Sequence, residues 1–151
     1  SQEEIGYDLG LIVPKKDKGL FKKVKTGKKP KAGWGTQTGK SAYSINRFFK
    51  KNKINLREKR FYLTEILKIK KFLQETLKKI VIIVCFDYPR LYNKKGESGH
   101  VSIIEGMEGN FVTLIEPLYR APKYRKVSLW KLSKAIRFHG RDKGAGFWVI
   151  N

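Results

Sequence analysis

Residues 99–117 read GHVSIIEGMEGNFVTLIEP, which is the pattern of a β-hairpin. Val101–Glu105 and Phe111–Ile115 are rich in β-branched and apolar residues, as strands require. A three-residue loop, Met107–Gly109, would place Gly109 at the left-handed position of a type I turn followed by a bulge. The segment therefore predicts two antiparallel strands joined by a short loop.

This hairpin would bring an imidazole and a carboxylate together. With the three-residue loop, His100 lies opposite Glu116, and directly opposed Cβ atoms are about 4.5–5.5 Å apart. A four-residue loop would shift the register by one residue and turn the two side chains to opposite faces. The other interpretation is a half-buried histidine at a strand end and a solvated glutamate before Pro117. The residues of the hairpin alone leave both interpretations open.

The segments around the hairpin predict helices first and then strands. The expected elements are an edge strand Leu9–Val13, a short strand Leu20–Val24, a helix over residues 36–51 capped by Thr36 or Thr38, a helix from Asn55 or Leu56 to Lys79 that is continuous or broken in its middle, a buried strand Ile80–Tyr88, a connection Pro117–Lys126, a helix Val127–Phe138 capped by Ser128, and a last strand Phe147–Ile150. This order is typical of an α+β fold in which N-terminal helices pack on a C-terminal antiparallel sheet.

Length and composition narrow the class of protein. A chain of 151 residues predicts one domain, here residues 33–151, preceded by a basic arm over residues 1–32 that includes the edge strand. The longest apolar run, Ile80–Phe86, is far shorter than the roughly 20 residues that span a bilayer. The N-terminus has no signal-peptide pattern, and the single cysteine, Cys85, excludes an intrachain disulfide, so we expect a cytoplasmic protein.

The charge is strongly positive and unevenly distributed. The chain has 34 Lys+Arg against 13 Asp+Glu, and residues 13–79 hold 22 of the bases and 4 of the acids. Such a field attracts nucleic acids and other polyanions. Lysine outnumbers arginine 26 to 8, which is also typical of thermophile surfaces and needs no polyanion. The candidate nucleic-acid contacts are Lys22, Lys23, Lys28, Lys29, Lys31, Arg120, Tyr124 and Arg125.

The residue inventory predicts neither a metal nor a cofactor. One cysteine and two histidines cannot supply the four ligands of a structural zinc site. The second histidine, His139, follows an expected helix and precedes Gly140. A charge partner for the C-terminus of that helix is therefore its simplest interpretation.

Five segments carry a resemblance to a known family when they are taken in order. They are TGKSAYSINRFF, IVIIVCFDYP, GHVSIIEG, IEP and LWKLSKAIRF…GFWVI. In this order they resemble the papain-like fold, and within it the double-glycine leader (bacteriocin-processing) peptidase-like family, over roughly residues 34–150. The resemblance implies a thiolate at a helix N-terminus, a histidine as general base, and a third residue that orients the imidazole.

The resemblance assigns roles residue by residue. The Gly-His pair places the base at His100, and the acid-Pro pair places its orienting residue at Glu116, where the family more often has Asp or Asn. The position of the family's cysteine falls on Thr38 or, in another alignment, on Ser41. Gln37 is the nearest match to an oxyanion-hole glutamine, although it lies closer to the nucleophile position than the family's spacing.

The leading hypothesis is a papain-like domain without its thiol nucleophile, which binds a peptide or protein tail in a cleft. A hydroxyl is a much weaker nucleophile than a thiolate, because its pKa lies far higher. The second hypothesis is a hydrolase, or a cysteine-substituted peptidase, that uses Thr38 or Ser41 with His100, Glu116 and Gln37. The third is a protein that binds nucleic acid or another polyanion through its lysines.

Overall fold

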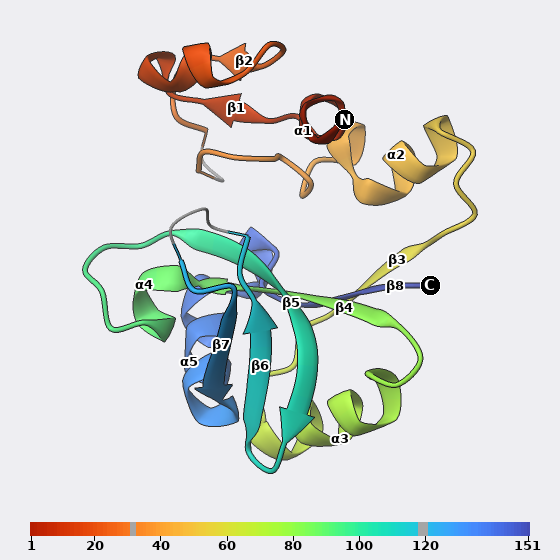
Figure 1. Ribbon diagram of the computed structural model, residues 1–151, viewed down its shortest axis with the longest axis vertical. Coiled ribbons are helices and arrows are strands. Elements are labelled where there is room, and N and C mark those ends of the chain that lie inside the picture. The colour runs from red at the N-terminus through yellow and green to blue at the C-terminus, as the bar shows by residue number, and fades with distance from the viewer. Residues whose placement is uncertain (31–32, 118–120) are drawn as a thin grey trace. The chain divides into compact units, whose positions relative to one another are not determined.

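The chain packs as two units, Ser1–Arg57 and Glu58–Asn151, in a computed structural model that describes residues 1–30, 33–117 and 121–151 (Figure 1). The boundary expected after residue 32 lies inside the first unit. Lys31 and Arg120, two of the candidate nucleic-acid contacts, lie outside the described residues.

The first unit is built from short elements. These are α1 (Gln2–Asp8), β1 (Ile12–Val13), the 3₁₀ helix η1 (Lys15–Leu20), β2 (Lys25–Thr26), the 3₁₀ helix η2 (Ser41–Tyr43) and α2 (Ile45–Lys51). A helix begins the chain because Ser1 and Glu4 form a reciprocal capping box. The expected strand Leu9–Val13 is shortened to β1, which pairs with β2 in parallel. The strand expected over Leu20–Val24 is wrong by several residues, since η1 ends at Leu20 and β2 begins at Lys25.

Helix α2 begins later than expected. Neither Thr36 nor Thr38 caps it; the cap is Ser44, whose hydroxyl accepts from the backbone N–H of Arg47 at 3.3 Å. Ser44 has extended backbone angles, which separate α2 from η2. Serine and threonine are both good N-terminal caps. The local sequence therefore did not show which of the three hydroxyls, Thr36, Thr38 or Ser44, would begin the helix.

The second unit is α+β, with one six-stranded antiparallel sheet in the order β3-β8-β4-β5-β6-β7. Its elements are β3 (Glu58–Phe61), α3 (Ile66–Thr76), β4 (Val81–Asp87), α4 (Tyr88–Leu91), β5 (Gly99–Glu108), β6 (Phe111–Ile115), β7 (Tyr124–Ser128), α5 (Leu129–His139), the 3₁₀ helix η3 (Arg141–Lys143) and β8 (Gly146–Ile150). The predicted buried strand, hairpin strands and last strand are confirmed with small changes of bounds.

Two sequence predictions fail in this unit. The helix expected from Asn55 or Leu56 begins only at Ile66, because Glu58–Phe61 pairs instead with β8 at the far end of the chain. Arg60 of β3 also stacks over the Trp148 ring of β8, with its Cζ 4.1 Å from the ring centroid. The segment expected to connect Pro117 to Lys126 contains the start of β7, and α5 begins two residues late at Leu129, although Ser128 caps it as expected.

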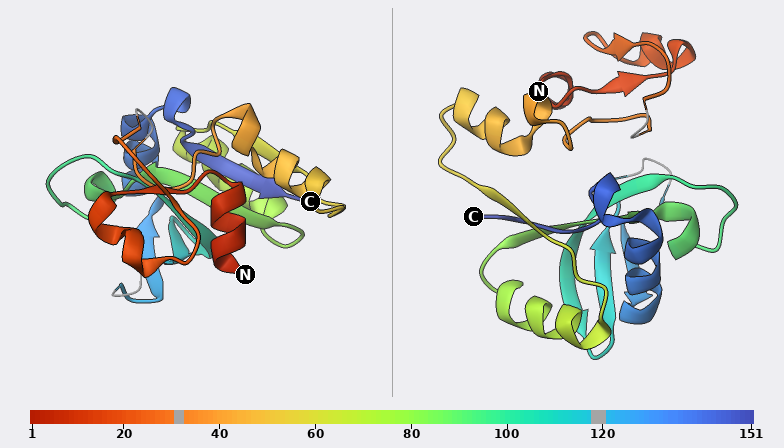
Figure 2. Two further views of the ribbon diagram at one scale, coloured as in Figure 1. Left: turned by 90° about the horizontal axis from the view of Figure 1, so that it is seen from above. Right: turned by 180° about the vertical axis from the view of Figure 1, so that it is seen from behind.

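The core lies between one face of the sheet and the helices α3 and α5 (Figure 2). Alternate residues of β4 point into it, and Ile82, Val84 and Phe86 are fully buried there. The other face carries partly exposed apolar side chains, such as Val101 and Ile103 of β5. Within the described residues, no helix is long and apolar enough to cross a membrane.

Candidate functional site

A buried polar cluster lies at one end of the sheet, where β5 begins and β6 ends. His100 and Ser102 come from β5, Glu116 directly follows β6, and Tyr92 directly follows α4. The sequence predicted His100 and Glu116. It did not predict Tyr92 or Ser102, because nothing in the local sequence around them differs from an ordinary loop and strand.

The loop of the hairpin differs from the expected one. Glu108 pairs with Phe111, so the loop is the two residues Gly109-Asn110 rather than the three residues 107–109. Gly109 has a positive φ of 59°, as the first central position of a type II′ turn requires. Continued to the strand ends, this register would place Glu116 opposite Ile103, on the face opposite to His100.

A β-bulge restores the pairing of the imidazole and the carboxylate. The register shifts by one residue between Ile104 and Gly106, so Ile103 now lies opposite Ile115. The next pair along the strands is therefore Ser102 and Glu116, and His100 is the diagonal neighbour on the same face. The bulge, and not the turn, sets which face the site occupies.

The Glu116 carboxylate accepts three hydrogen bonds. His100 Nε2 lies 2.7 Å from Oε2, Tyr92 Oη donates to Oε1 at 2.7 Å, and Ser102 Oγ donates to Oε1 at 2.8 Å. The Glu116 side chain has no exposed surface. The alternative of a solvated glutamate is therefore wrong.

These contacts decide the charge of the carboxylate. Burial raises the pKa of Glu116, but its three hydrogen bonds outweigh that effect and hold the pKa below its ordinary value. The carboxylate is thus ionised at neutral pH despite its burial. Burial and the bond to Glu116 together raise the pKa of Tyr92 well above its ordinary value, so the phenol remains a donor.

The carboxylate also selects the tautomer of His100. An ionised carboxylate only accepts hydrogen bonds, so Nε2 carries the proton and a neutral ring keeps its lone pair on Nδ1. The ring is held by edge contacts to Phe86 and Tyr88, with centroids 5.6 and 5.0 Å away. The arrangement can accept a proton or a hydrogen bond at Nδ1, and Glu116 can stabilise the resulting imidazolium.

The loop that supplies Tyr88 and Tyr92 is anchored by Asp87. This buried carboxylate accepts from Arg90 N at 2.8 Å and from Ser98 N at 3.0 Å, which ties both ends of the loop together. Arg125 of β7 lies over the Tyr92 ring, 4.3 Å from its centroid. Arg125 is also a candidate nucleic-acid contact, and its guanidinium packs on Tyr92 beside the cluster.

Close packing against α5 explains the glycine before His100. A Cβ added to Gly99 would lie 2.5 Å from Cε1 of His139, the last residue of α5. The sequence interpretation placed His139 at the C-terminal end of a helix, and it is the last residue of α5. Burial lowers the pKa of His139, which disfavours the positive charge that a helix-end partner would carry.

The predicted nucleophiles and oxyanion donor lie in the first unit. Thr38 is nearly buried in a turn, and Ser41 is exposed at the first position of η2, so neither begins α2. Both amide N–H groups of Gln37 have partners, because Nε2 donates to the carbonyls of Gly33 and Gly35 at 3.1 Å each. Gln37 thus closes a turn around Trp34 in the observed arrangement.

Cys85 cannot act as a thiolate beside His100. In the β4–β5 pairing Phe86 lies opposite His100 and Cys85 opposite Val101, so the thiol is on the other face of the sheet. Burial raises the pKa of Cys85 to about 12. Within residues 1–30, 33–117 and 121–151, no three His, Cys, Asp or Glu side chains form a metal-binding group.

The remaining candidate nucleic-acid residues are divided between the two units. Lys22, Lys23, Lys28 and Lys29 lie in the first unit, where Lys23 sits over the Tyr7 ring at 4.4 Å. Tyr124 lies in β7 and is half exposed.

No family model, curated protein or solved structure matches this chain.

Proposed function

We propose that this chain is a papain-like, peptidase-related domain that has lost thiol chemistry and binds a peptide or protein tail. The observation that carries the proposal is the His100 ring held at Nε2 by the buried Glu116 carboxylate. That pair is the orienting half of the site expected from the family resemblance. Burying the Glu116 charge is unfavourable by itself. The three hydrogen-bond donors around the carboxylate offset that cost.

The loss of thiol chemistry rests on Cys85. It is the only cysteine of the chain, it is buried, and its raised pKa of about 12 keeps it protonated at neutral pH. The positions that match the family's cysteine are Thr38 and Ser41, which are hydroxyls. A hydroxyl needs a stronger activating base than a thiol does, so binding without cleavage is the simpler function.

A bound peptide would use the nitrogen that Glu116 leaves open. No described residue bonds Nδ1 of His100, and a neutral ring offers a lone pair there to a peptide N–H or hydroxyl. The side chain of His100 is only 13% exposed, so such a contact would be largely shielded from water. A hydrogen bond in such surroundings is stronger than one in bulk water.

The test is a titration of the full chain with ten-residue peptides that contain a Gly-Gly pair. This pair gives the double-glycine leader peptidase-like family its name. Chemical shifts of His100 report the contact, and the variant Glu116→Gln should weaken binding at least about tenfold because it alters the tautomer of the ring. Glu105→Gln, an exposed carboxylate at the bulge of the same hairpin, is the matched control. Equal affinity of both variants and the parent chain would contradict the proposal.

A second measurement separates binding from hydrolysis. Incubation with a fluorophosphonate, which labels activated hydroxyl nucleophiles, should leave the chain unmodified. Labelling of Thr38 or Ser41 that disappears in His100→Asn would overturn the binding-only function in favour of a hydrolase.

A further inference from the structure

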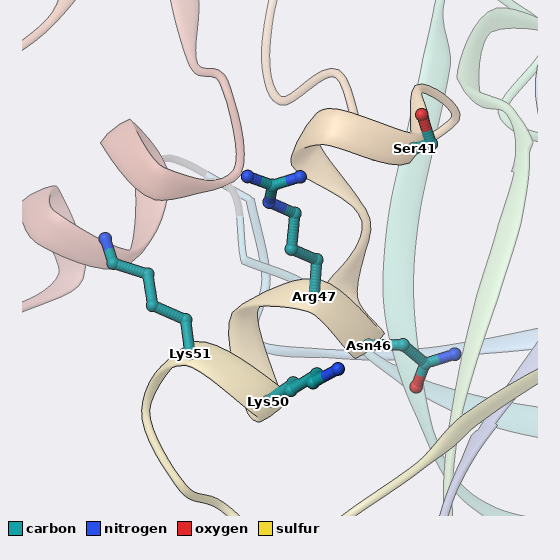
Figure 3. A pocket seen from close by; sticks show the side chains of 5 residues that line it. All are labelled: Ser41, Asn46, Arg47, Lys50 and Lys51. Atoms are coloured by element: carbon teal, nitrogen blue, oxygen red, sulfur yellow. The ribbon is translucent and has the colours of Figure 1, made fainter.

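The first unit contains a basic cavity that is lined by no residue of the His100 cluster and, among the predicted catalytic residues, by Ser41 alone. Its volume is about 720 Å³, and its lining residues are Ser41, Asn46, Arg47, Lys50 and Lys51 (Figure 3). All five belong to η2 or α2. The cavity therefore depends only on the local structure of the first unit.

Helix α2 carries three cationic side chains close together in sequence, Arg47, Lys50 and Lys51. Arg47 and Lys51 are four residues apart and Arg47 and Lys50 three apart, which are the spacings at which side chains of a helix are neighbours. In Figure 3 the Arg47 guanidinium rises towards the turn that carries Ser41, and the tip of Lys50 points towards Asn46. Like charges at these spacings repel one another, and a bound anion would relieve that repulsion.

Only one of the three cations is neutralised. Lys51 Nζ contacts both carboxylate oxygens of Asp8, at 2.8 and 3.0 Å. Neither Arg47 nor Lys50 forms an ion pair with any acidic side chain in the described part of the chain. The cavity thus has two positive charges that are not balanced by a neighbouring carboxylate.

Hydrogen bonds of Ser44 connect the turn that carries Ser41 to the start of α2. Ser44 caps α2 and its hydroxyl also donates to the Ser41 carbonyl at 3.1 Å, so the turn before the helix is tied to its first residues. Ile45 and Phe49 are buried and face away from the lining residues, all of which are exposed. The cationic face is therefore supported by an apolar face of the same helix.

From these contacts we infer that the cavity binds a phosphate group. An arginine fork and a lysine at neighbouring positions of one helix supply the positive charge and the hydrogen-bond donors that a phosphate binds. Hydroxyl and amide side chains such as Ser41 and Asn46 are the neutral groups that commonly complete phosphate contacts in proteins. The phosphate would come either from a free polyphosphate or from the backbone of a single-stranded nucleic acid.

The experiment is calorimetric titration of the full chain with tripolyphosphate at low salt. The double variant Arg47→Gln/Lys50→Gln should bind at least about tenfold more weakly, because removing even one charge-assisted hydrogen bond to the phosphate costs at least that factor. Lys16→Gln/Lys18→Gln removes the same charge from exposed positions of η1 and should bind like the parent chain. Since the lining residues are exposed, circular dichroism should show both variants folded, and Lys50→Gln alone gives a second variant with a smaller loss.

Three results would overturn the inference. One is an equal loss in the two double variants, which would mean that only the total charge matters. The second is an absence of tripolyphosphate binding by the parent chain, and the third is binding that the cavity variant retains. A parallel titration with a ten-residue oligouridylate identifies the source: binding that also depends on Arg47 and Lys50 indicates a nucleic-acid backbone, and binding of tripolyphosphate alone indicates a free polyphosphate.

Discussion

Replacing Glu116 by glutamine should change both the stability of the second unit and the tautomer of His100. Glutamine has nearly the same shape, so the change removes the charge and one acceptor oxygen without leaving a cavity. Hydrogen bonds to a charged group contribute about 1.5–3 kcal/mol and neutral ones about 0.5–1.5 kcal/mol. Weakening three such bonds, less the relief of a buried charge, predicts a net loss of about 1–3 kcal/mol in the free energy of unfolding.

The tautomer change follows from which atoms face each other. The glutamine carbonyl would take the place of Oε1, because Tyr92 and Ser102 both donate there. Its NH₂ group then faces Nε2, which must give up its proton and become an acceptor. Nitrogen-15 spectra of the imidazole should therefore show the proton on Nε2 in the parent chain and on Nδ1 in Glu116→Gln.

The pH dependence supplies an independent check. The folded pKa of Glu116 lies below the ordinary value of 4.5, so its stabilising contribution is complete above pH 4.5 and is lost as the pH falls through the folded value. Urea unfolding of Glu116→Gln should lack this acid-side loss, whereas Glu105→Gln should retain it. An unchanged tautomer, together with unfolding free energies within about 0.5 kcal/mol of the parent, would refute the reasoning, since surface substitutions alone have effects of that size.

Three further outcomes follow from the same region. Gly99→Ala should destabilise the unit by about 1–3 kcal/mol because the new Cβ meets His139, and His139→Ala in the same chain should recover part of that loss in urea unfolding. Cys85 should react with an aromatic disulfide reagent at pH 8 only in denaturant, and rapid labelling of the native chain would contradict its burial and its pKa of about 12. The neutral Tyr92 phenol stabilises the fold below its ordinary pKa of 10.0 and this contribution is lost as the pH rises through its higher folded value, so Tyr92→Phe should lack the alkaline loss of stability that the parent chain shows.

Sequence patterns succeeded where an element is specified by its own residues. The run Ile80–Tyr88 predicted a buried strand because it is continuously apolar, and Ser128 predicted a helix start because a serine hydroxyl can accept the N–H three residues later. The same reasoning failed at Glu58–Phe61. That segment has no strand pattern of its own and becomes extended because it adds to β8, about ninety residues further along the chain.

The sequence predicted one part of the candidate site and missed another. Alternation along the two strands predicted that His100 and Glu116 can share a face, but the predicted three-residue loop was wrong. The observed two-residue loop would have separated them, and a bulge between Ile104 and Gly106 brings them back together. Gly106 at the bulge is a residue type that often marks such an irregularity inside a strand, but the register that the bulge corrects depends on how both strands pair.

The sequence by itself determined the basic charge, the absence of a free thiolate candidate other than Cys85, and the alternation that gives the sheet one buried face, because these properties depend only on which residues occur and at what spacing. The tertiary structure alone decided the strand order, the register at His100, and the arrival of Tyr92 and Ser102 at the Glu116 carboxylate. These features join residues that are far apart in the sequence, from Tyr92 and Glu116, 24 positions apart, to Glu58 and Ile150 at opposite ends of the second unit, and their positions are set by how the elements pack rather than by local preference.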